Sequence, residues 1–591
     1  MAFNAFNQDE KTVEKSKIST MFRLFKYLLK YKLRIFIVSV LMGFGTFVAL
    51  INPLLIETAI DKYISKSNFR GLVKITVIAL VLNLLMILAI KLRMLLMAKT
   101  SNKIIENIRE DLYVHIQSLD LHFFDSRPTG KILARITGDV NSLKDVIENS
   151  VTTFIPGLVT VFAVAIIMFI KNSTLALATL STLPPLIIGI VLISIKAEGH
   201  WRQKRKKSSN MSAFINESMQ GIKIIQGFNA EKETEETFSQ LVADDRKSFM
   251  SAVTWCDAFG SIIDLCWFGG MFMMYFVGIK IIGIENISIG TYIAFGSYIG
   301  MFWQPVMNLS NFYNQIVNAA SGAERIFEIL DTKPLIKDSD KAFDMPEIKG
   351  NVTFENVTFA YDEEKNVLEN VSFSVKAGQT VALVGPTGAG KSTIVNLISR
   401  FYDVQKGAVL IDGINIQDVK ITSLRKQMGI MTQDNYIFSG TIRENIAYGN
   451  LEAREEEILE ASKAVHAHDF IMELEHGYDT ILTARGNELS NGQRQLIAFA
   501  RTMLSMPRIL ILDEATSSID TKTELQVQSG ISAMLKDRTS FVIAHRLSTI
   551  QNADIIFVVD NKGIIESGSP KELMEIKGHY YNLYMAQFSS K

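Results

Sequence analysis

The sequence is poor in cysteine and carries no excess of either charge. Its 591 residues contain only Cys256 and Cys266, both within apolar surroundings. This scarcity excludes a disulfide scaffold, and two buried thiols explain the pair better than a metal or redox site does. Basic and acidic residues number 61 each, so the net charge is zero. A polyanion-binding role gains no support from this balance, and we expect no nucleic-acid partner.

The start of the chain lacks the succession of basic, apolar and small residues that marks a cleaved secretory signal. Residues 1–20 are polar and are expected to be disordered. Residues 21–33 place apolar side chains at helical spacing with lysines between them, which is typical of an amphipathic helix on the inner membrane surface. The same stretch is also compatible with the cytoplasmic start of a first membrane span.

Long apolar runs are abundant, and 48% of the residues are hydrophobic. Six segments are each long enough to cross a bilayer, which takes about 20 residues. A buried helix of a soluble protein rarely stays so apolar over such a length without a charge. The segments lie near 35–60, 72–98, 152–171, 174–196, 258–282 and 286–310. The sequence therefore predicts a helical membrane domain with six spans.

Two long polar stretches, 99–151 and 197–257, divide these spans into three pairs. They are rich in lysine and arginine, whereas the short connections carry few charges, so we expect these stretches and both termini in the cytoplasm. Their composition favours spans that continue as helices beyond the membrane. The turns at 122–130 and 216–221 would then lie farthest from the membrane, where a soluble domain can contact them. Plain helical-hairpin turns are the alternative.

Asp264 is an acidic residue inside the fifth apolar segment. A carboxylate at membrane depth is costly, so its side chain should face a cavity, a partner or a proton. Contact with substrate or proton and a structural hydrogen bond to a neighbouring helix are both compatible with this position.

The second half of the chain contains a loop suited to phosphate. Residues 385–392 read G-P-T-G-A-G-K-S, after the strand-like run 380–384 and before a helical pattern that starts at Ser392. This context distinguishes a phosphate site from a glycine-rich turn with a chance lysine. Glycines allow consecutive N–H groups and the positive end of the helix to face the phosphates. Lys391 then reaches the β- and γ-phosphates, and the Ser392 hydroxyl ligates Mg²⁺.

An apolar run at 509–512 ends in Asp513 and Glu514. Such a run predicts a buried strand, and ligands of α/β sheets bind at the carboxyl ends of the strands. Asp513 fits the Mg²⁺-binding acid of P-loop ATPases, and Glu514 fits the group that polarises the attacking water. Solvated acids at the end of an ordinary strand are the alternative.

Three further residues are candidate nucleotide contacts because of their order in the sequence relative to the phosphate loop. Gln433 can reach both Mg²⁺ and the attacking water, and His545, after another β run, can contact the γ-phosphate. Tyr361 precedes the loop and can stack on adenine through its ring face. Each alone is a weak signal, because surface glutamines, histidines and strand tyrosines are common.

Residues 489–493 read L-S-N-G-Q and precede a helical pattern. Ser490 and the N–H groups at that helix start can hold a phosphate. One nucleotide does not need two phosphate-binding sites from the same domain. This motif therefore indicates a second domain that faces the first, with nucleotide between them.

With these motifs the chain resembles an ATP-binding cassette (ABC) transporter of the exporter type, as one half-transporter covering roughly 20–590. The resemblance implies an all-α six-helix transmembrane domain with long cytoplasmic helical extensions, followed by an α/β P-loop nucleotide-binding domain. It also implies ATP and Mg²⁺ as cofactors. The turns at 122–130 and 216–221 resemble the coupling helices of this family. The expected parts are a disordered N-terminus 1–20, a transmembrane domain 21–322 with an elbow helix, a linker 323–348 and an ATPase domain 349–591.

The site residues that the resemblance implies fall into three groups. Nucleotide contacts are Tyr361, Gly385, Thr387, Gly388, Gly390, Lys391, Ser392, Thr393, Ser490, Gly492 and Gln493. Metal ligands are Ser392, Gln433 and Asp513, and catalytic residues are Glu514, His545 and Gln433.

Two departures from the family pattern concern the face that serves the opposite domain's ATP. Asn491 replaces the first glycine of the usual L-S-G-G-Q, and Ala484 stands where an acid is usual. The chain's own Lys391, Asp513, Glu514 and His545 match the pattern. The residues for the chain's own ATP thus match the pattern, whereas those for the opposite domain's ATP depart from it. This combination resembles one partner of a heterodimeric exporter, so a heterodimer is favoured over a homodimer.

The resemblance implies ATP-driven export of amphipathic small molecules, drugs or lipids across the cytoplasmic membrane by alternating access. The chain would be a multi-pass protein of the lipid bilayer, paired with a second half-transporter. A peptide exporter, an importer built on the same frame and a non-transport regulatory ATPase are the alternatives.

Overall fold

The computed structural model describes residues 23–24, 26–362, 365–432, 435–513, 521–543 and 551–588. These residues belong to two compact units. The first unit comprises Met1–Gln117 and Gly130–Thr332, and the second comprises Ser118–Thr129 and Lys333–Lys591. A short segment from the first half of the sequence is therefore part of the second unit.

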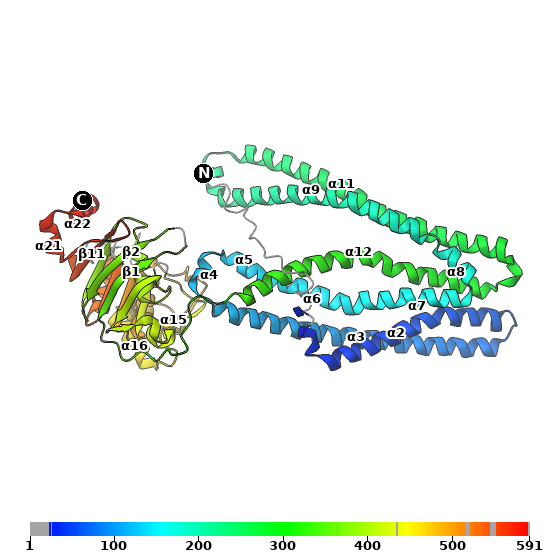
Figure 1. The fold of residues 1–591 in the computed structure, drawn as a ribbon, viewed down its shortest axis with the longest axis horizontal. Helices are drawn as coiled ribbons and strands as arrows, with labels where there is room; N and C mark the ends of the chain where they lie inside the picture. Colours follow the sequence, from blue (N-terminus) through cyan, green and yellow to red (C-terminus); the bar gives the residue numbers. More distant parts are fainter. Residues whose placement is uncertain are drawn as a thin grey trace. The chain divides into compact units, whose positions relative to one another are not determined.

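The first unit consists of helices, several of them far longer than a bilayer crossing needs (Figure 1). The longest, α3, has 49 residues and no proline, so nothing in its sequence interrupts the backbone hydrogen bonds. The helices are α2 (Lys32–Thr58), η1 (Ala59–Ile64), α3 (Phe69–Gln117), α5 (Thr129–Ala134), η2 (Arg135–Asp139), α6 (Val140–Asn149), η3 (Ser150–Phe154), α7 (Ile155–Lys171), α8 (Ser173–Leu180), α9 (Leu183–Gln220), α10 (Ile222–Gly227), α11 (Glu231–Val277), η4 (Gly278–Gly283), η5 (Ile284–Asn286) and α12 (Ile289–Asp331).

Five helical segments of the described chain are long and apolar enough to cross a membrane. They are Lys32–Ile64, Phe69–Gln117, Thr129–Lys171, Ser173–Gln220 and Glu231–Gly283. These segments contain the first five predicted spans and extend well beyond most of them, as expected for helices that continue outside the bilayer. The sixth predicted span, 286–310, falls on η5 and the start of α12, where several side chains are not described. The count of six spans therefore stays a prediction.

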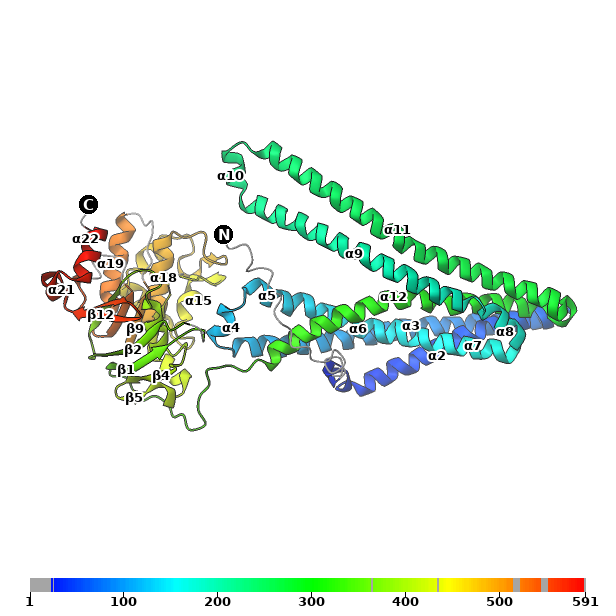
Figure 2. The same cartoon turned by 45° about the horizontal axis from the view of Figure 1, so that its top comes forward.

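Helices α9 and α11 form a long hairpin with α10 at its tip (Figure 2). Toward α10 the hairpin diverges from the other helices of the unit, as both views show. Asp264 is exposed on α11, next to Leu265, which is 71% exposed. The Asp264 side chain is therefore not buried within its own unit, and its role stays a prediction.

Polar side chains join three helices near the C-terminal end of α2. Glu57 accepts hydrogen bonds from Lys171 Nζ at 2.6 Å and from the Thr291 hydroxyl at 3.0 Å. Asp61 accepts from the backbone N–H of Gly290 at 3.0 Å and from the Ser288 hydroxyl. Because these partners lie at the end of α7 and around the start of α12, the two carboxylates hold these helix ends together.

The second unit contains a six-stranded sheet in the order β12-β11-β3-β10-β9-β6, whose strands run parallel except β12. Alternate residues of β9 enter different apolar clusters, with Ile509 and Ile511 in one and Leu510 and Leu512 in the other. Both faces of the sheet are thus covered, which explains why its strands read as continuous apolar runs. A four-stranded antiparallel sheet, β2-β1-β4-β5, and a pair, β7-β8, complete the unit.

The elements of this unit are as follows. The strands are β1 (Val352–Phe359), β2 (Leu368–Val375), β3 (Thr380–Val384), β4 (Lys406–Ile411), β5 (Ile414–Asn415), β6 (Met428–Met431), β7 (Gly440–Thr441), β8 (Ile481–Leu482), β9 (Ile509–Asp513), β10 (Thr539–Ile543), β11 (Ile555–Asp560) and β12 (Gly563–Gly568). The helices are α4 (Leu121–Asp125), α13 (Lys391–Ile398), η6 (Ile416–Asp418), α14 (Ile421–Arg425), α15 (Ile442–Ala447), α16 (Glu455–Ala464), α17 (His468–Met472), η7 (Gly477–Asp479), α18 (Asn491–Leu504), α19 (Thr521–Leu535), α21 (Pro570–Ile576) and α22 (His579–Phe588).

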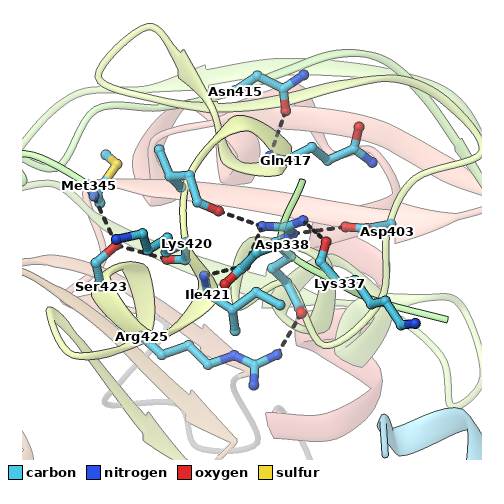
Figure 3. A network of polar contacts seen from close by, with 12 residues as sticks. Lys337, Asp338, Met345, Asp403, Asn415, Gln417, Lys420, Ile421, Ser423 and Arg425 are labelled. Atoms are coloured by element: carbon cyan, nitrogen blue, oxygen red, sulfur yellow. Dashed lines mark hydrogen bonds and ion pairs between the residues drawn. The ribbon is translucent and has the colours of Figure 1, made fainter. Parts of the chain in front are cut away.

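The region expected as a linker, 323–348, is more ordered than its composition indicates. Helix α12 continues to Asp331, because Ala323, Ile326 and Phe327 bury one of its faces at helical spacing. From Lys333 onward the chain belongs to the second unit. There Asp338 accepts a hydrogen bond from the Ile421 N–H at 2.9 Å, within a network of polar contacts that fastens this segment to the rest of the second unit (Figure 3).

Candidate nucleotide-binding site

The phosphate-loop motif folds as strand, loop and helix. Strand β3 ends at Val384, and α13 begins at Lys391 with Gly390 as its N-cap. Gly385 and Gly390 have φ angles of 147° and 106°, in the region that L side chains rarely adopt. A Cβ on Gly385 would lie 2.1 Å from the Val559 carbonyl oxygen, so only glycine fits there. The loop therefore approaches β11 closely and leads directly into the first N–H groups of α13, which suit a phosphate.

Lys391 lies over this loop. Its Nζ donates hydrogen bonds to the carbonyl oxygens of Gly385 and Pro386, both at 2.8 Å. Burial lowers the pKa of the Lys391 ammonium, and the nearby Asp513 carboxylate opposes that shift. The ammonium is thus held between the loop and an acid, at the place where the phosphates of a nucleotide would lie.

Asp513 ends β9 at the same edge of the sheet as the loop. The parallel register pairs Ile543 with Asp513 on one side and with Leu383 on the other, so the carboxyl ends of three strands align. The carboxyl end of β6 lies at the same edge, because Met431 pairs with Leu512. Gln433, Glu514 and His545 follow β6, β9 and β10 closely in sequence, and all three lie outside the described residues.

Tyr361 and Thr393, two of the predicted nucleotide contacts, lie side by side. Their hydroxyl oxygens are 3.2 Å apart. The Tyr361 ring also packs edge-on against Phe359 and Tyr402, with centroids 5.0 Å away in each case. Tyr361 is half-buried, so part of its surface is left to stack on a base.

Ser490 forms the N-cap of α18 in the L-S-N-G-Q motif. Its hydroxyl oxygen accepts from the Gln493 N–H at 3.2 Å, and the Gln493 side chain accepts from the Ser490 N–H at 2.9 Å. This capping box fixes the exposed start of α18, whose N–H groups suit a phosphate. Gly492 is buried, and Asn491 is exposed and hydrogen-bonded to Arg494.

The side chains present fit Mg²⁺ as well as ATP. Ser392 is exposed in the first turn of α13, and Asp513 ends a strand at the same edge of the sheet. A hydroxyl oxygen and a carboxylate are the hard donors that Mg²⁺ takes when it is shared with phosphate oxygens. Thr387 and Gly388 are exposed in the loop between β3 and α13.

Sequence reasoning missed the residues that join this site to α4. Tyr402, which packs on Tyr361, donates a hydrogen bond from its hydroxyl to the Asp125 carboxylate. Asp120 accepts from the Leu335 N–H at 2.5 Å. Asp125 stands in one of the two turns that were singled out, but no sequence signal pairs it with a tyrosine 277 positions away.

Comparison with known proteins agrees with this arrangement. Residues 35–306 match the family model of the ABC transporter transmembrane region, and residues 368–517 match that of the ABC transporter. An uncharacterized ABC transporter ATP-binding protein of Bacillus subtilis is 40% identical over 587 residues, which cover 99% of this chain and 97% of that protein. An ATP-dependent lipid A-core flippase of Syntrophus aciditrophicus is 37% identical over 504 residues, covering 84% and 82%.

A solved structure extends the likeness to three dimensions. It is that of a bacterial Atm1-family ABC exporter with ATP bound, with a TM-score of 0.77 and 28% identity, covering 94% of this chain and 98% of that one. In this chain the transmembrane region precedes the ATP-binding region, and the likeness to the solved structure covers nearly the whole chain. The chain therefore belongs to the ABC transporter family, as a half-transporter of the exporter type.

Proposed function

We propose that this half-transporter exports amphipathic small molecules, drugs or lipids across the cytoplasmic membrane by alternating access. Membership of the family makes it a multi-pass membrane protein whose ATPase activity is coupled to transport, and ATP-driven export follows at the level of the family. The finer proposal draws support from the long apolar helices and from relatives whose names include a lipid A-core flippase and a probable multidrug resistance transporter. Both termini and the ATPase domain would be cytoplasmic.

One observation carries the ATPase part of the proposal. The Lys391 ammonium, the positive-φ loop and Asp513 meet at one edge of a parallel sheet. In the proposed mechanism Lys391 binds the β- and γ-phosphates, and Ser392 and Asp513 would hold Mg²⁺, which would supply positive charge to the phosphates. Glu514 orients the attacking water and accepts its proton.

Two further side chains complete the proposed chemistry. Gln433 positions the attacking water next to the metal ligands, and His545 donates to the γ-phosphate and so distinguishes ATP from ADP. Both follow strands whose carboxyl ends lie at the edge that Asp513 occupies.

The exposed, capped start of α18 supports the proposal of a paired assembly. Ser490 and the N–H groups after it would bind the γ-phosphate of the ATP held by the second half-transporter, and the partner would do the same in return. Closure then forms contacts that exist only with two ATPs bound, which shifts the population toward an outward-open membrane domain. A heterodimer is favoured over a homodimer, because Ala484 and Asn491 depart from the family pattern on this shared face alone.

Transport into inside-out proteoliposomes tests the function. Purified protein is supplied with Mg-ATP, and two amphipathic probes are followed: the dye Hoechst 33342 and a fluorescent phosphatidylethanolamine. We expect ATP-dependent accumulation or flipping of at least one probe, and none with Lys391→Ala. ATP hydrolysis that moves neither probe and responds to neither would contradict export of this substrate class and favour a regulatory ATPase.

A further inference from the structure

Tyr402 lies between the candidate adenine contact and α4. Its side chain is 7% exposed, and its ring packs on Tyr361 with centroids 5.0 Å apart and planes at 90°. Phe359 packs against the same ring at 5.6 Å. On the other side the Tyr402 hydroxyl donates to the carboxylate of Asp125, the last residue of α4. One buried side chain thus contacts the predicted base platform and the helix.

Helix α4 is held at a second point, so that it cannot simply pivot about Tyr402. One carboxylate oxygen of Asp120 caps the helix by accepting from the Phe123 N–H, and the other accepts from the Leu335 N–H at 2.5 Å. Phe123 is 3% exposed, and the Arg127 guanidinium lies over its ring at 4.6 Å. Two acids therefore fix both ends of α4 within the second unit.

The chain enters and leaves α4 through long apolar helices. Segment Phe69–Gln117 ends shortly before it, and segment Thr129–Lys171 begins shortly after it, and both are long and apolar enough to span a membrane. A displacement of α4 is therefore passed through the covalent backbone to two membrane helices. Packed aromatic rings transmit such a displacement, because a close-packed interior responds by moving between discrete arrangements rather than by compressing.

We propose that Tyr402 is a positioning residue that reports a purine base stacked on Tyr361 to α4 through its ring on one side and its hydroxyl on the other. The proposal rests on the proposed function in one respect, namely that the base of the nucleotide lies against Tyr361. A base stacked there fixes the Tyr361 ring, which fixes the Tyr402 ring and the direction of its hydroxyl toward Asp125. Burial and the Asp125 carboxylate both raise the pKa of Tyr402, so the hydroxyl remains a donor at working pH.

Deuterium exchange of the full-length protein in nanodiscs tests this chain of contacts. ADP supplies the base without closing a two-ATP assembly, and pyrophosphate supplies phosphates without a base. We expect Mg-ADP to slow exchange of residues 118–129 by about tenfold in the wild type, the effect of one hydrogen bond to a charged group, and Mg-pyrophosphate to leave it unchanged. The quantity compared is the ratio of the exchange rates of residues 118–129 without and with Mg-ADP. In Tyr402→Phe this ratio should fall to near one, while the Kd for ADP changes less than about threefold, as for a lost contact outside the binding site.

A matched control is Tyr478→Phe, which removes another buried tyrosine hydroxyl, hydrogen-bonded to His468 at 3.0 Å and remote in sequence from α4. Its exchange ratio should equal that of the wild type. Asp125→Ala removes the acceptor from the α4 side without changing the core around Tyr402, and it should also abolish the ratio. This second variant carries the test if Tyr402→Phe does not fold.

Two results would overturn the proposal. A purely structural Tyr402 would raise exchange of residues 118–129 equally with and without ADP and leave the ratio intact. Pyrophosphate that protects α4 as well as ADP does would place the signal in the phosphates rather than the base. Failure of the wild type to bind ADP would instead count against the nucleotide site itself, and so against the proposed function.

Discussion

Arg400 offers the sharpest test of how the cassette holds the segment that follows α12. Its side chain is 1% exposed, and the guanidinium donates to the carbonyl oxygens of Val419 at 2.7 Å and Lys337 at 3.2 Å. Its Nε donates to the Asp403 carboxylate at 3.1 Å. Lys337, Asp338 and Asp403 lie close together in the network of Figure 3, where Lys337 takes part through its backbone carbonyl. Arg400→Met keeps the length and apolar stem of the side chain and removes all of these donors.

The size of the effect follows from the three hydrogen bonds. Each hydrogen bond to a charged group is worth about 1.5–3 kcal/mol, but the values do not add, and loss of the buried charge relieves part of its own desolvation. A net loss of about 3–5 kcal/mol is the expected range for breaking a buried ionic network from one side. At about 2–4 °C per kcal/mol for a domain of this size, the melting temperature should fall by roughly 6–20 °C.

Thermal unfolding of the full-length protein in detergent measures this loss. The unfolding transition of the cassette is the one whose melting temperature Mg-ATP raises. The control is Arg454→Met, whose side chain is 77% exposed and pairs with Glu457 at 3.5 Å. An exposed pair contributes less than about 1 kcal/mol, so the control should shift little. If Arg400→Met shifts no more than the control does, the burial cost of the guanidinium cancels its hydrogen bonds and the reasoning is wrong.

Three other changes test separate parts of the molecule. Glu514→Gln should retain ATP binding and lose at least about 100-fold in turnover, as for removal of a general base; normal hydrolysis would remove Glu514 from its role. Asp264→Asn should slow probe transport, whereas unchanged rates and pH dependence would end the functional interpretation of Asp264. Lys171→Met should lower the melting temperature of the helical unit by leaving the Glu57 carboxylate without its cationic partner, and the added change Glu57→Gln should restore much of it; equal losses would contradict the pairing.

The phosphate loop was predictable because its constraints are local. Gly385 and Gly390 are required by the backbone angles of the loop itself, and Lys391 lies within a few residues of the carbonyl oxygens that it contacts. The sheet edge was predictable almost as well, because the apolar run that ends in Asp513 is typical of a buried strand. Five of the predicted spans were found for the same kind of reason, since length and hydropathy depend on neighbouring residues alone.

The contacts that connect these parts could not be predicted from one sequence. Residues 337–348 are polar and read as a linker, yet Arg400 and Gln427 fasten them to the rest of the second unit through backbone carbonyl and N–H groups that carry no sequence signature. The bond between Tyr402 and Asp125 is of the same kind. The sequence around Tyr402 and around Asp125 has no unusual feature, and only the fold brings the two residues together.

Asn491 shows where geometry changes a sequence argument. A glycine replaced by asparagine in the L-S-G-G-Q motif raises the question of whether a backbone angle is lost. Asn491 begins α18 and is absent from the described residues with positive φ, so its conformation is open to any L residue. The substitution costs no backbone strain, and its exposed amide is held by Arg494 rather than extended over the helix start. A heterodimer is then favoured over a homodimer because of Ala484 alone. In a homodimer both copies lack the acid at this position, whereas a different partner can supply it.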